Sequence, residues 1–127
     1  MKSFRLPPHA LAAALAAFAV LFGSASTGTA AAASGPHYDV PSGYTRCAHA
    51  VAWHGFFKWA SQEGTNCRET ARFMRRYAAH ASGPSMPRHV ASYRCRIHYW
   101  RDQAGDIYAS RHVCTHGRVT IRFYGMV

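Results

Sequence analysis

The residues best suited to chemistry in this sequence are arginines and aromatic residues that alternate along its C-terminal third. If this segment folds as strands, five arginines and two aromatic side chains share one face: Arg94, Arg96, Arg111, Arg118, Arg122, Trp100 and Tyr124. Guanidinium groups interleaved with aromatic rings suit phosphates and stacked bases, and equally anionic envelope polymers or acidic protein surfaces. The alternative interpretation is that these charges only solvate a small domain, since no sequence-specific nucleic-acid motif accompanies them. A second basic stripe has helical spacing and consists of Arg68, Arg72, Arg75 and Arg76.

Histidines raise the question of a metal site, because eight of the nine follow residue 33. His112, Cys114 and His116 occupy every second position, and Cys47 with His49 could add ligands. Thiolate ligands require reduced cysteines, whereas the cysteines of an exported chain are expected to be oxidised. The sequence therefore predicts no metal and no cofactor.

Carboxylates for acid–base catalysis are scarce. The five are Asp39, Glu63, Glu69, Asp102 and Asp106, and no serine-hydrolase, zinc-peptidase or P-loop motif is present. A small secreted ribonuclease would need a His with a Glu or second His, and an Arg to hold the phosphate. The candidates for those roles are His98, His112, Glu63 and Arg96, but no spacing joins them. We expect a protein that is not an enzyme, with a ribonuclease as one alternative.

A secreted protease inhibitor is the other alternative. Small exported proteins of that class present a rigid loop, and residues 83–87 (Gly-Pro-Ser-Met-Pro) could form one that displays Met86. The same segment could be an ordinary connector between a helix and a strand.

The N-terminal quarter has the composition of a secretory leader. Lys2 and Arg5 are basic, residues 10–22 form an apolar run, and residues 31–33 are alanines suited to cleavage. The run is shorter than the roughly 18 residues expected of a membrane-spanning helix. We expect residues 1–33 to be a signal peptide, residues 34–46 a flexible arm, and residues 47–127 a single small domain. That domain would act outside the cell or in its envelope, with no transmembrane segment.

The chain that remains after the leader is basic and poor in aliphatic residues. Of 15 Lys+Arg, Lys2 and Arg5 lie in the leader, so 13 face 5 Asp+Glu, a net charge of +8. Every Leu also lies in the leader, so the remaining apolar bulk is aromatic and the core is expected to be thin. We expect disulfides to compensate, between Cys47, Cys67, Cys95 and Cys114. Of three possible pairings we favour 47–67 with 95–114, each bridge contributing roughly 3 kcal/mol.

The elements that must position these residues begin with a helix. Asn66 is a suitable N-cap, and Glu69 could reach back to it in a capping box. A stripe of apolar or small residues follows at helical spacing, and the Gly-Pro at 83–84 then stops it. The sequence predicts a helix over residues 67–81.

Period-two alternation predicts a three-stranded antiparallel meander after residue 92. A two-residue turn at 116–117 would pair Cys114 with Val119, and a four-residue connection at 103–106 would set Cys95 opposite Cys114. This register turns His112 and Ser110 inward. Residues 47–63 fit either two short strands around positions 54–55 or a helical turn, and we favour the strands. The predicted fold is α+β, with one helix packed on the meander, a short N-terminal strand pair and disulfide bridges.

Three motifs give the chain a resemblance to a known group. They are Asn-Cys-x-x-Thr-Ala at 66–71, Tyr-Arg-Cys-Arg at 93–96, and Cys-Thr-His-Gly-Arg-Val-x-Ile-x-Phe at 114–123. Over about residues 47–124 the chain resembles small exported bacterial proteins with this Cys-helix-Cys-hairpin-Cys layout, most of which have no assigned activity. The resemblance implies a fold and supplies no catalytic residues.

Overall fold

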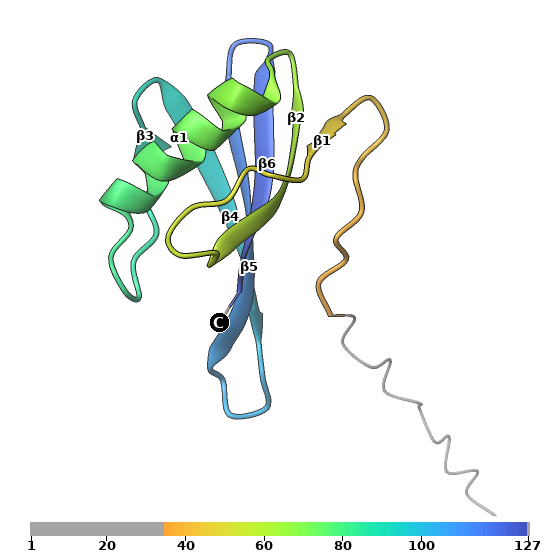
Figure 1. The fold of residues 1–127 in the computed structure, drawn as a ribbon. Helices are drawn as coiled ribbons and strands as arrows, with labels where there is room; N and C mark the ends of the chain where they lie inside the picture. The colour runs from red at the N-terminus through yellow and green to blue at the C-terminus, as the bar shows by residue number, and fades with distance from the viewer. Residues whose placement is uncertain (1–34, 127) are drawn as a thin grey trace, which may run out of the picture. The chain divides into compact units, whose positions relative to one another are not determined.

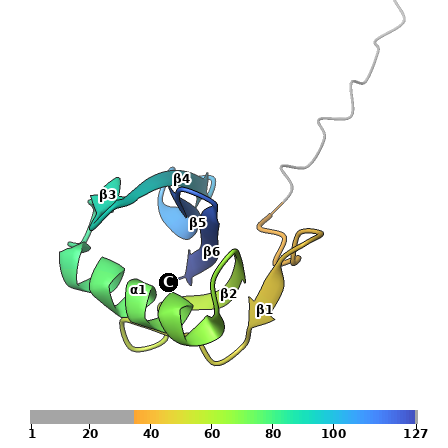
Figure 2. The ribbon, with the colours of Figure 1, turned by 90° about the horizontal axis from the view of Figure 1, so that it is seen from above.

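The structure, a computed structural model, describes residues 35–126, so the expected leader lies outside the described residues. The elements are β1 (Thr45–Cys47), β2 (Phe57–Glu63), α1 (Cys67–His80), β3 (His89–Val90), β4 (Tyr93–Arg101), β5 (Ile107–His116) and β6 (Val119–Met126). The strands form one antiparallel sheet in the order β1-β2-β6-β5-β4-β3 (Figure 1). Seen from above, the sheet curves around α1 (Figure 2). The α+β class is confirmed, but the predicted meander is only the β4-β5-β6 part of a six-stranded sheet.

The helix forms where the sequence predicted it, from Cys67, and ends one residue early at His80. Asn66 is the N-cap, and its side-chain oxygen accepts the backbone N–H of Glu69 at 2.9 Å. The second half of the capping box is wrong, because the Glu69 carboxylate pairs at 2.8 Å with Arg72, one turn further on. The buried stripe faces the sheet and consists of Thr70, Phe73, Met74 and Tyr77.

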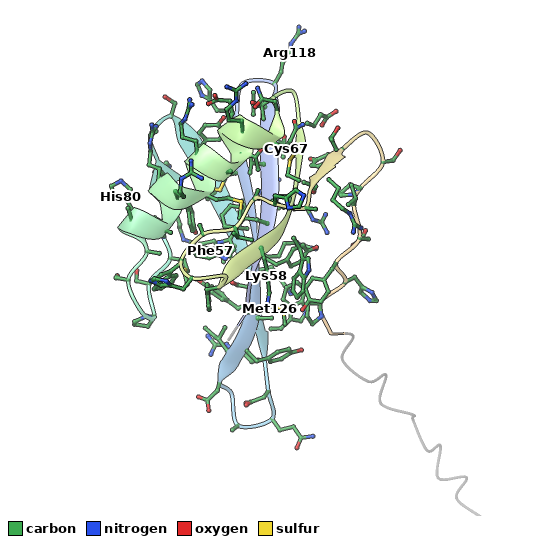
Figure 3. The ribbon with its side chains drawn as sticks, in the orientation of Figure 1. Phe57, Lys58, Cys67, His80, Arg118 and Met126 are labelled. Atoms are coloured by element: carbon green, nitrogen blue, oxygen red, sulfur yellow. A yellow bond between two sulfur atoms is a disulfide. The ribbon has the colours of Figure 1, made fainter. Side chains whose placement is uncertain are left out.

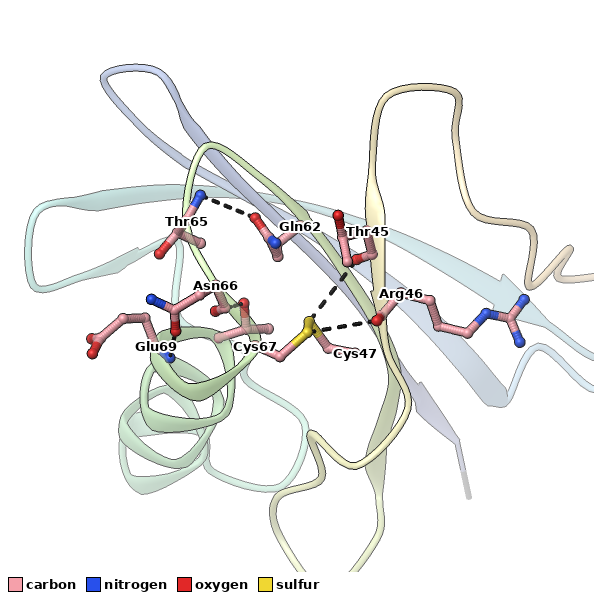
Figure 4. Close-up of a disulfide and its surroundings, with 9 residues drawn as sticks. Thr45, Arg46, Cys47, Gln62, Thr65, Asn66, Cys67 and Glu69 are labelled. Carbon is pink, nitrogen blue, oxygen red and sulfur yellow. Dashed lines mark hydrogen bonds between the residues drawn. A yellow bond between two sulfur atoms is a disulfide. The ribbon is translucent and has the colours of Figure 1, made fainter.

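The two disulfides are Cys47–Cys67 and Cys95–Cys114, which is the pairing that the sequence favoured. The first ties β1 to the first residue of α1 (Figure 4). The second joins directly opposite residues of β4 and β5, as predicted. Such bridges indicate an oxidising, non-cytoplasmic environment.

The turn between β5 and β6 differs from its prediction by one position. Its two central residues are Gly117 and Arg118, so Cys114 lies opposite Ile121 rather than Val119. Gly117 has a φ of 56°, which suits the first central position of a type II′ turn. Because the pairing shifts by two residues, every side chain stays on its predicted face.

The N-terminal strand pair exists, but at other residues than predicted. β1 pairs with β2 so that Cys47 lies opposite Ala60, and β2 in turn pairs with β6. Around positions 54–55 there is only a single bridge, between Ala52 and Phe57. β2 also contains a bulge where Trp59 has a φ of 50°, an arrangement that period-two alternation does not predict.

The core between sheet and helix is aromatic, as the lack of leucine predicts. The Phe57 ring packs edge-on against Tyr77, His112 and Phe123, with centroids 5.2–5.5 Å apart. Gly125 lets the turn before β2 approach this layer, since a Cβ there would lie 2.6 Å from the Phe56 ring and 2.7 Å from Ser110 Oγ.

Candidate functional site

The candidate site is the outer face of the sheet, meaning the face away from α1. Directly opposite residues on neighbouring strands share a face, so the register assembles it row by row. One row places Arg96 beside Val113 and Arg122, and the next places His98 beside Arg111 and Tyr124. The structure thus brings six of the seven predicted polyanion-binding residues to one face: Arg94, Arg96, Arg111, Arg122, Trp100 and Tyr124.

The seventh predicted residue, Arg118, is not part of this face. It occupies the β5-β6 turn and projects beyond the end of the sheet (Figure 3). The four arginines of the helical stripe lie on α1, on the other side of the sheet, and are exposed. The predicted cationic residues therefore fall into three separate groups.

The β4-β5 side of the outer face carries uncompensated positive charge. Neither strand contains an Asp or Glu, while Arg94 and Arg96 are exposed and Arg111 is half-buried. The Arg111 guanidinium lies 5.8 Å from the centroid of the Trp100 ring, an arrangement in which a cation and a stacking surface adjoin. Such a surface can hold an anionic group and stack a flat one beside it.

The β6 side of the same face is covered by the N-terminal arm. Tyr124 is only 1% exposed, and its hydroxyl donates to the backbone oxygen of His37 at 2.6 Å. Arg122 donates to the Tyr124 hydroxyl at 2.6 Å and to Asp39 at 3.4 Å. The Tyr38 ring lies 4.1 Å from that of Trp59. Residues 35–44 form no helix or strand, yet they occupy the contacts that Arg122 and Tyr124 would need for a ligand.

The inner face holds a buried chain of three polar side chains, which the sequence did not predict to be connected to one another. His112 Nε2 lies 2.8 Å from Ser110 Oγ, and its Nδ1 lies 2.8 Å from the Tyr77 hydroxyl. The sequence signal was the inward placement of Ser110 and His112. Each ring nitrogen thus faces a hydroxyl that can donate or accept, so either tautomer of the imidazole is satisfied.

This chain has the spacing of a nucleophile and its base, but its environment does not suit catalysis. Burial lowers the pKa of His112 to about 3, so the neutral imidazole is a poor acceptor for a serine proton. Burial also raises the pKa of Tyr77, which keeps its hydroxyl protonated. Ser110 itself is only 2% exposed. The arrangement satisfies polar groups inside the core and orients them.

The residues considered for a ribonuclease are not brought together. His98 and Arg96 lie on the outer face, whereas His112 is buried on the inner face. Glu63 lies at the end of β2, opposite Thr120. His98 and His112 therefore lie on opposite faces of the sheet and cannot flank one phosphate together.

Four of the five residues considered for a metal have other partners, and the fifth, His49, is exposed. Cys114 is in a disulfide, His112 is bonded on both ring nitrogens, and His116 Nδ1 lies 3.1 Å from the backbone oxygen of Ser92. Within residues 35–126 no group of three or more His, Cys, Asp or Glu side chains is placed to hold a metal ion.

The loop considered for a protease inhibitor turns its key residue inward. Ser82 and Ser85 close a tight turn, leaving Gly83 and Pro84 exposed at its tip. Met86 is half-buried and packs against the core. The side chain that the inhibitor hypothesis would present to a protease is thus engaged within the domain.

No helix in the described part of the chain is long and apolar enough to cross a membrane. Comparison of the sequence and the fold with protein-family models, curated proteins and solved structures finds no match.

Proposed function

We propose that this is an exported, non-catalytic protein whose outer sheet face binds anionic polymers, of the cell envelope or nucleic acid. The observation that carries the proposal is the charge pattern of β4 and β5. Arg94, Arg96 and Arg111 lie on two neighbouring strands that contain no carboxylate, and Arg111 adjoins the Trp100 ring. Positive charge concentrated on one face of a sheet favours salt-sensitive, sequence-independent binding of anionic polymers.

Four of the five acidic residues lie off the β4-β5 side of the outer face or at its end. The fifth, Glu63, lies on β2, in the row that leads through Thr120 and Thr115 to Arg94. Glu69 pairs with Arg72 on the helix, and Asp39 pairs with Arg122 under the arm. Asp102 and Asp106 lie in the β4-β5 connection, where Asp102 accepts two backbone N–H groups. The positive potential of the β4-β5 side is thus compensated only at its end.

The test is retention on immobilised heparin, compared between two variants of equal charge. Arg94→Ala with Arg96→Ala removes two cations from the outer face, and Arg75→Ala with Arg76→Ala removes two from the helix. We expect the sheet variant to elute at clearly lower salt than the helix variant, because only the first removes contacts to the polymer.

Equal elution of the two variants, both below the wild-type salt concentration, would show that net charge alone governs retention and would contradict a specific surface. Elution of both at the wild-type salt concentration would contradict polyanion binding altogether. Cooperative unfolding of each variant in urea controls for loss of the fold.

A further inference from the structure

β4 has an open edge over the second half of its length. On one side it pairs with β5 from Arg94 to Arg101, but on the other side β3 reaches only Tyr93 and Arg94. The last contact at this edge is the N–H of Cys95, which donates to the backbone oxygen of Arg88 at 2.8 Å. Among the described residues, no strand pairs with positions 96–101 at this edge. Open edges of this kind are where extended peptides add to a sheet.

The backbone groups that this edge offers can be assigned from the disulfide. Cys95 and Cys114 lie opposite each other with Cα atoms 4.0 Å apart, the close spacing of a pair whose N–H and C=O groups point away from each other. The hydrogen bond from Cys95 to Arg88 confirms that direction. Since the direction alternates along a strand, Ile97 and Tyr99 also present N–H and C=O groups to the open edge.

A cleft adjoins this edge on the inner side of the sheet. It has a volume of about 370 Å³, and its walls include Tyr99 of β4, Ile107 of β5, Met86 of the loop before β3, and Trp53 and Phe56 of the turn before β2. Trp53 is 37% exposed, which is high for so large an apolar side chain. Tyr99 belongs both to the open edge and to the cleft. A side chain on the inner face of an added strand, opposite Tyr99, would therefore lie at the cleft.

The charges along the edge select the kind of strand that fits. The outward side chains of β4 include Arg94, Arg96 and His98, and Arg101 is the last residue of the strand. The strand contains no carboxylate. Residues opposite each other on neighbouring strands interact directly, so acidic residues there are favoured and basic ones are disfavoured. A second copy pairing through its own β4 would add the same cations and gain no opposite charge.

We propose that the open edge of β4 binds an extended segment of a partner protein by strand addition. The segment alternates acidic residues, which face Arg96 and His98, with apolar residues, of which one enters the cleft beside Tyr99. This goes beyond the proposed polyanion binding, because recognition rests on backbone hydrogen bonds and a cleft as well as on charge. All pairings in the sheet are antiparallel, and the added strand is antiparallel too.

The test uses a fluorescein-labelled octapeptide of alternating Glu and Val, and two twins with methylated backbone nitrogens. In an antiparallel pair, the residue opposite Ile97 exchanges both hydrogen bonds with it and carries its side chain on the same, inner face. That residue is a Val of the peptide. Methylation of the Val nitrogens should therefore weaken binding about tenfold, measured by fluorescence anisotropy, whereas methylation of the Glu nitrogens should leave it unchanged.

The matching protein variant is Ile97→Pro, which removes one N–H of the open edge and none from the β4-β5 pairing. We expect it to weaken the peptide by about tenfold while heparin elution stays at its wild-type value. The two proposals can therefore fail independently. If this variant does not fold, the two methylated peptides still decide the matter.

Equal binding of the two methylated twins would overturn strand addition, because it would show that charge alone holds the peptide. Absence of binding by the unmodified peptide at physiological ionic strength would overturn it as well. A variant of the cleft, Met86→Ala, should weaken the Glu-Val peptide and leave a peptide of alternating Glu and Gly unaffected.

Discussion

The two faces of the sheet treat their polar residues in opposite ways. On the inner face, Ser110, His112 and Tyr77 satisfy one another and are closed off by aromatic rings. On the outer face, Arg122 and Tyr124 are satisfied only because the arm covers them, and Arg94 and Arg96 have no protein partner within the described residues. The comparison teaches that the cations without a partner lie where neither helix nor arm reaches, on the β4-β5 side, which is where we propose that binding occurs.

The strongest way to break the inner face is to remove its cross-strand bridge. Replacing Cys95 and Cys114 by Ala opens a link between residues 19 apart in sequence, which should lower the free energy of unfolding by about 3 kcal/mol. Urea denaturation of the oxidised wild type and the double variant measures this loss. A change below about 1 kcal/mol would mean that the aromatic core is sufficient without the bridge.

The inner face should also make stability depend on pH through His112. Burial lowers its pKa to about 3 in the folded protein, against an ordinary value of 6.5. As the pH falls below 6.5, the unfolded chain takes up a proton that the folded protein refuses, so stability declines until the pH reaches about 3. Between about pH 7.5 and about pH 5 this amounts to about 2 kcal/mol.

The control for this dependence is His112→Phe, which keeps an aromatic ring in the core but cannot titrate. The variant is expected to be less stable at neutral pH, because two buried hydroxyls lose a partner. Between about pH 7.5 and about pH 5, however, the free energy of unfolding of the variant should fall by about 2 kcal/mol less than that of the wild type. An unchanged slope would show that His112 is not the group responsible.

Removal of the Asp39 charge from the outer face should change the stability of the protein little and its binding to heparin more clearly. Asp39 is 65% exposed, so Asp39→Asn should change the free energy of unfolding by less than about 0.5 kcal/mol. The same variant should elute from heparin at higher salt, because Arg122 loses its internal anion. The matched control is Glu69→Gln, which removes an equal charge from α1, where Glu69 pairs with Arg72. If the two variants shift elution equally, the arm does not compete for the outer face.

Much of the fold could be predicted because its signals are local. An N-cap residue with a helical stripe defined α1, and period-two alternation with two cysteines defined the β4-β5 pairing. The inward placement of His112 followed from the same register, although an outward Val113 next to it argued against it. These elements are long enough for periodicity to show.

The missed features depend on contacts that no local pattern encodes. β1 has three residues and β3 has two, too few for an alternation to be recognised. The β5-β6 turn was misplaced because a glycine at either central position is compatible with a tight turn, and only the strand pairing, which sets His116 opposite Val119, decides between them.

The sequence predicted which residues form the candidate site, but not which of them are accessible to a ligand. Alternation correctly placed Arg122 and Tyr124 on the outer face. It could not indicate that residues 37–39, more than 80 positions away in sequence, lie over them. The sequence also could not indicate that the Glu69 carboxylate pairs with Arg72 instead of completing the capping box. Both contacts are available to Glu69 locally and are of similar strength.

Gly125 leaves room for two side chains against the same face of β6. On it rest the Phe56 ring, a wall of the cleft, and the Ser110 hydroxyl, one end of the buried polar chain. A single methyl group at this position must push one of them aside, with no change in the charge of either face. Gly125→Ala should therefore change the width of the cleft by displacing Phe56, or disturb the buried polar chain by displacing Ser110. The NMR signals of the His112 and Tyr77 rings would distinguish the two outcomes.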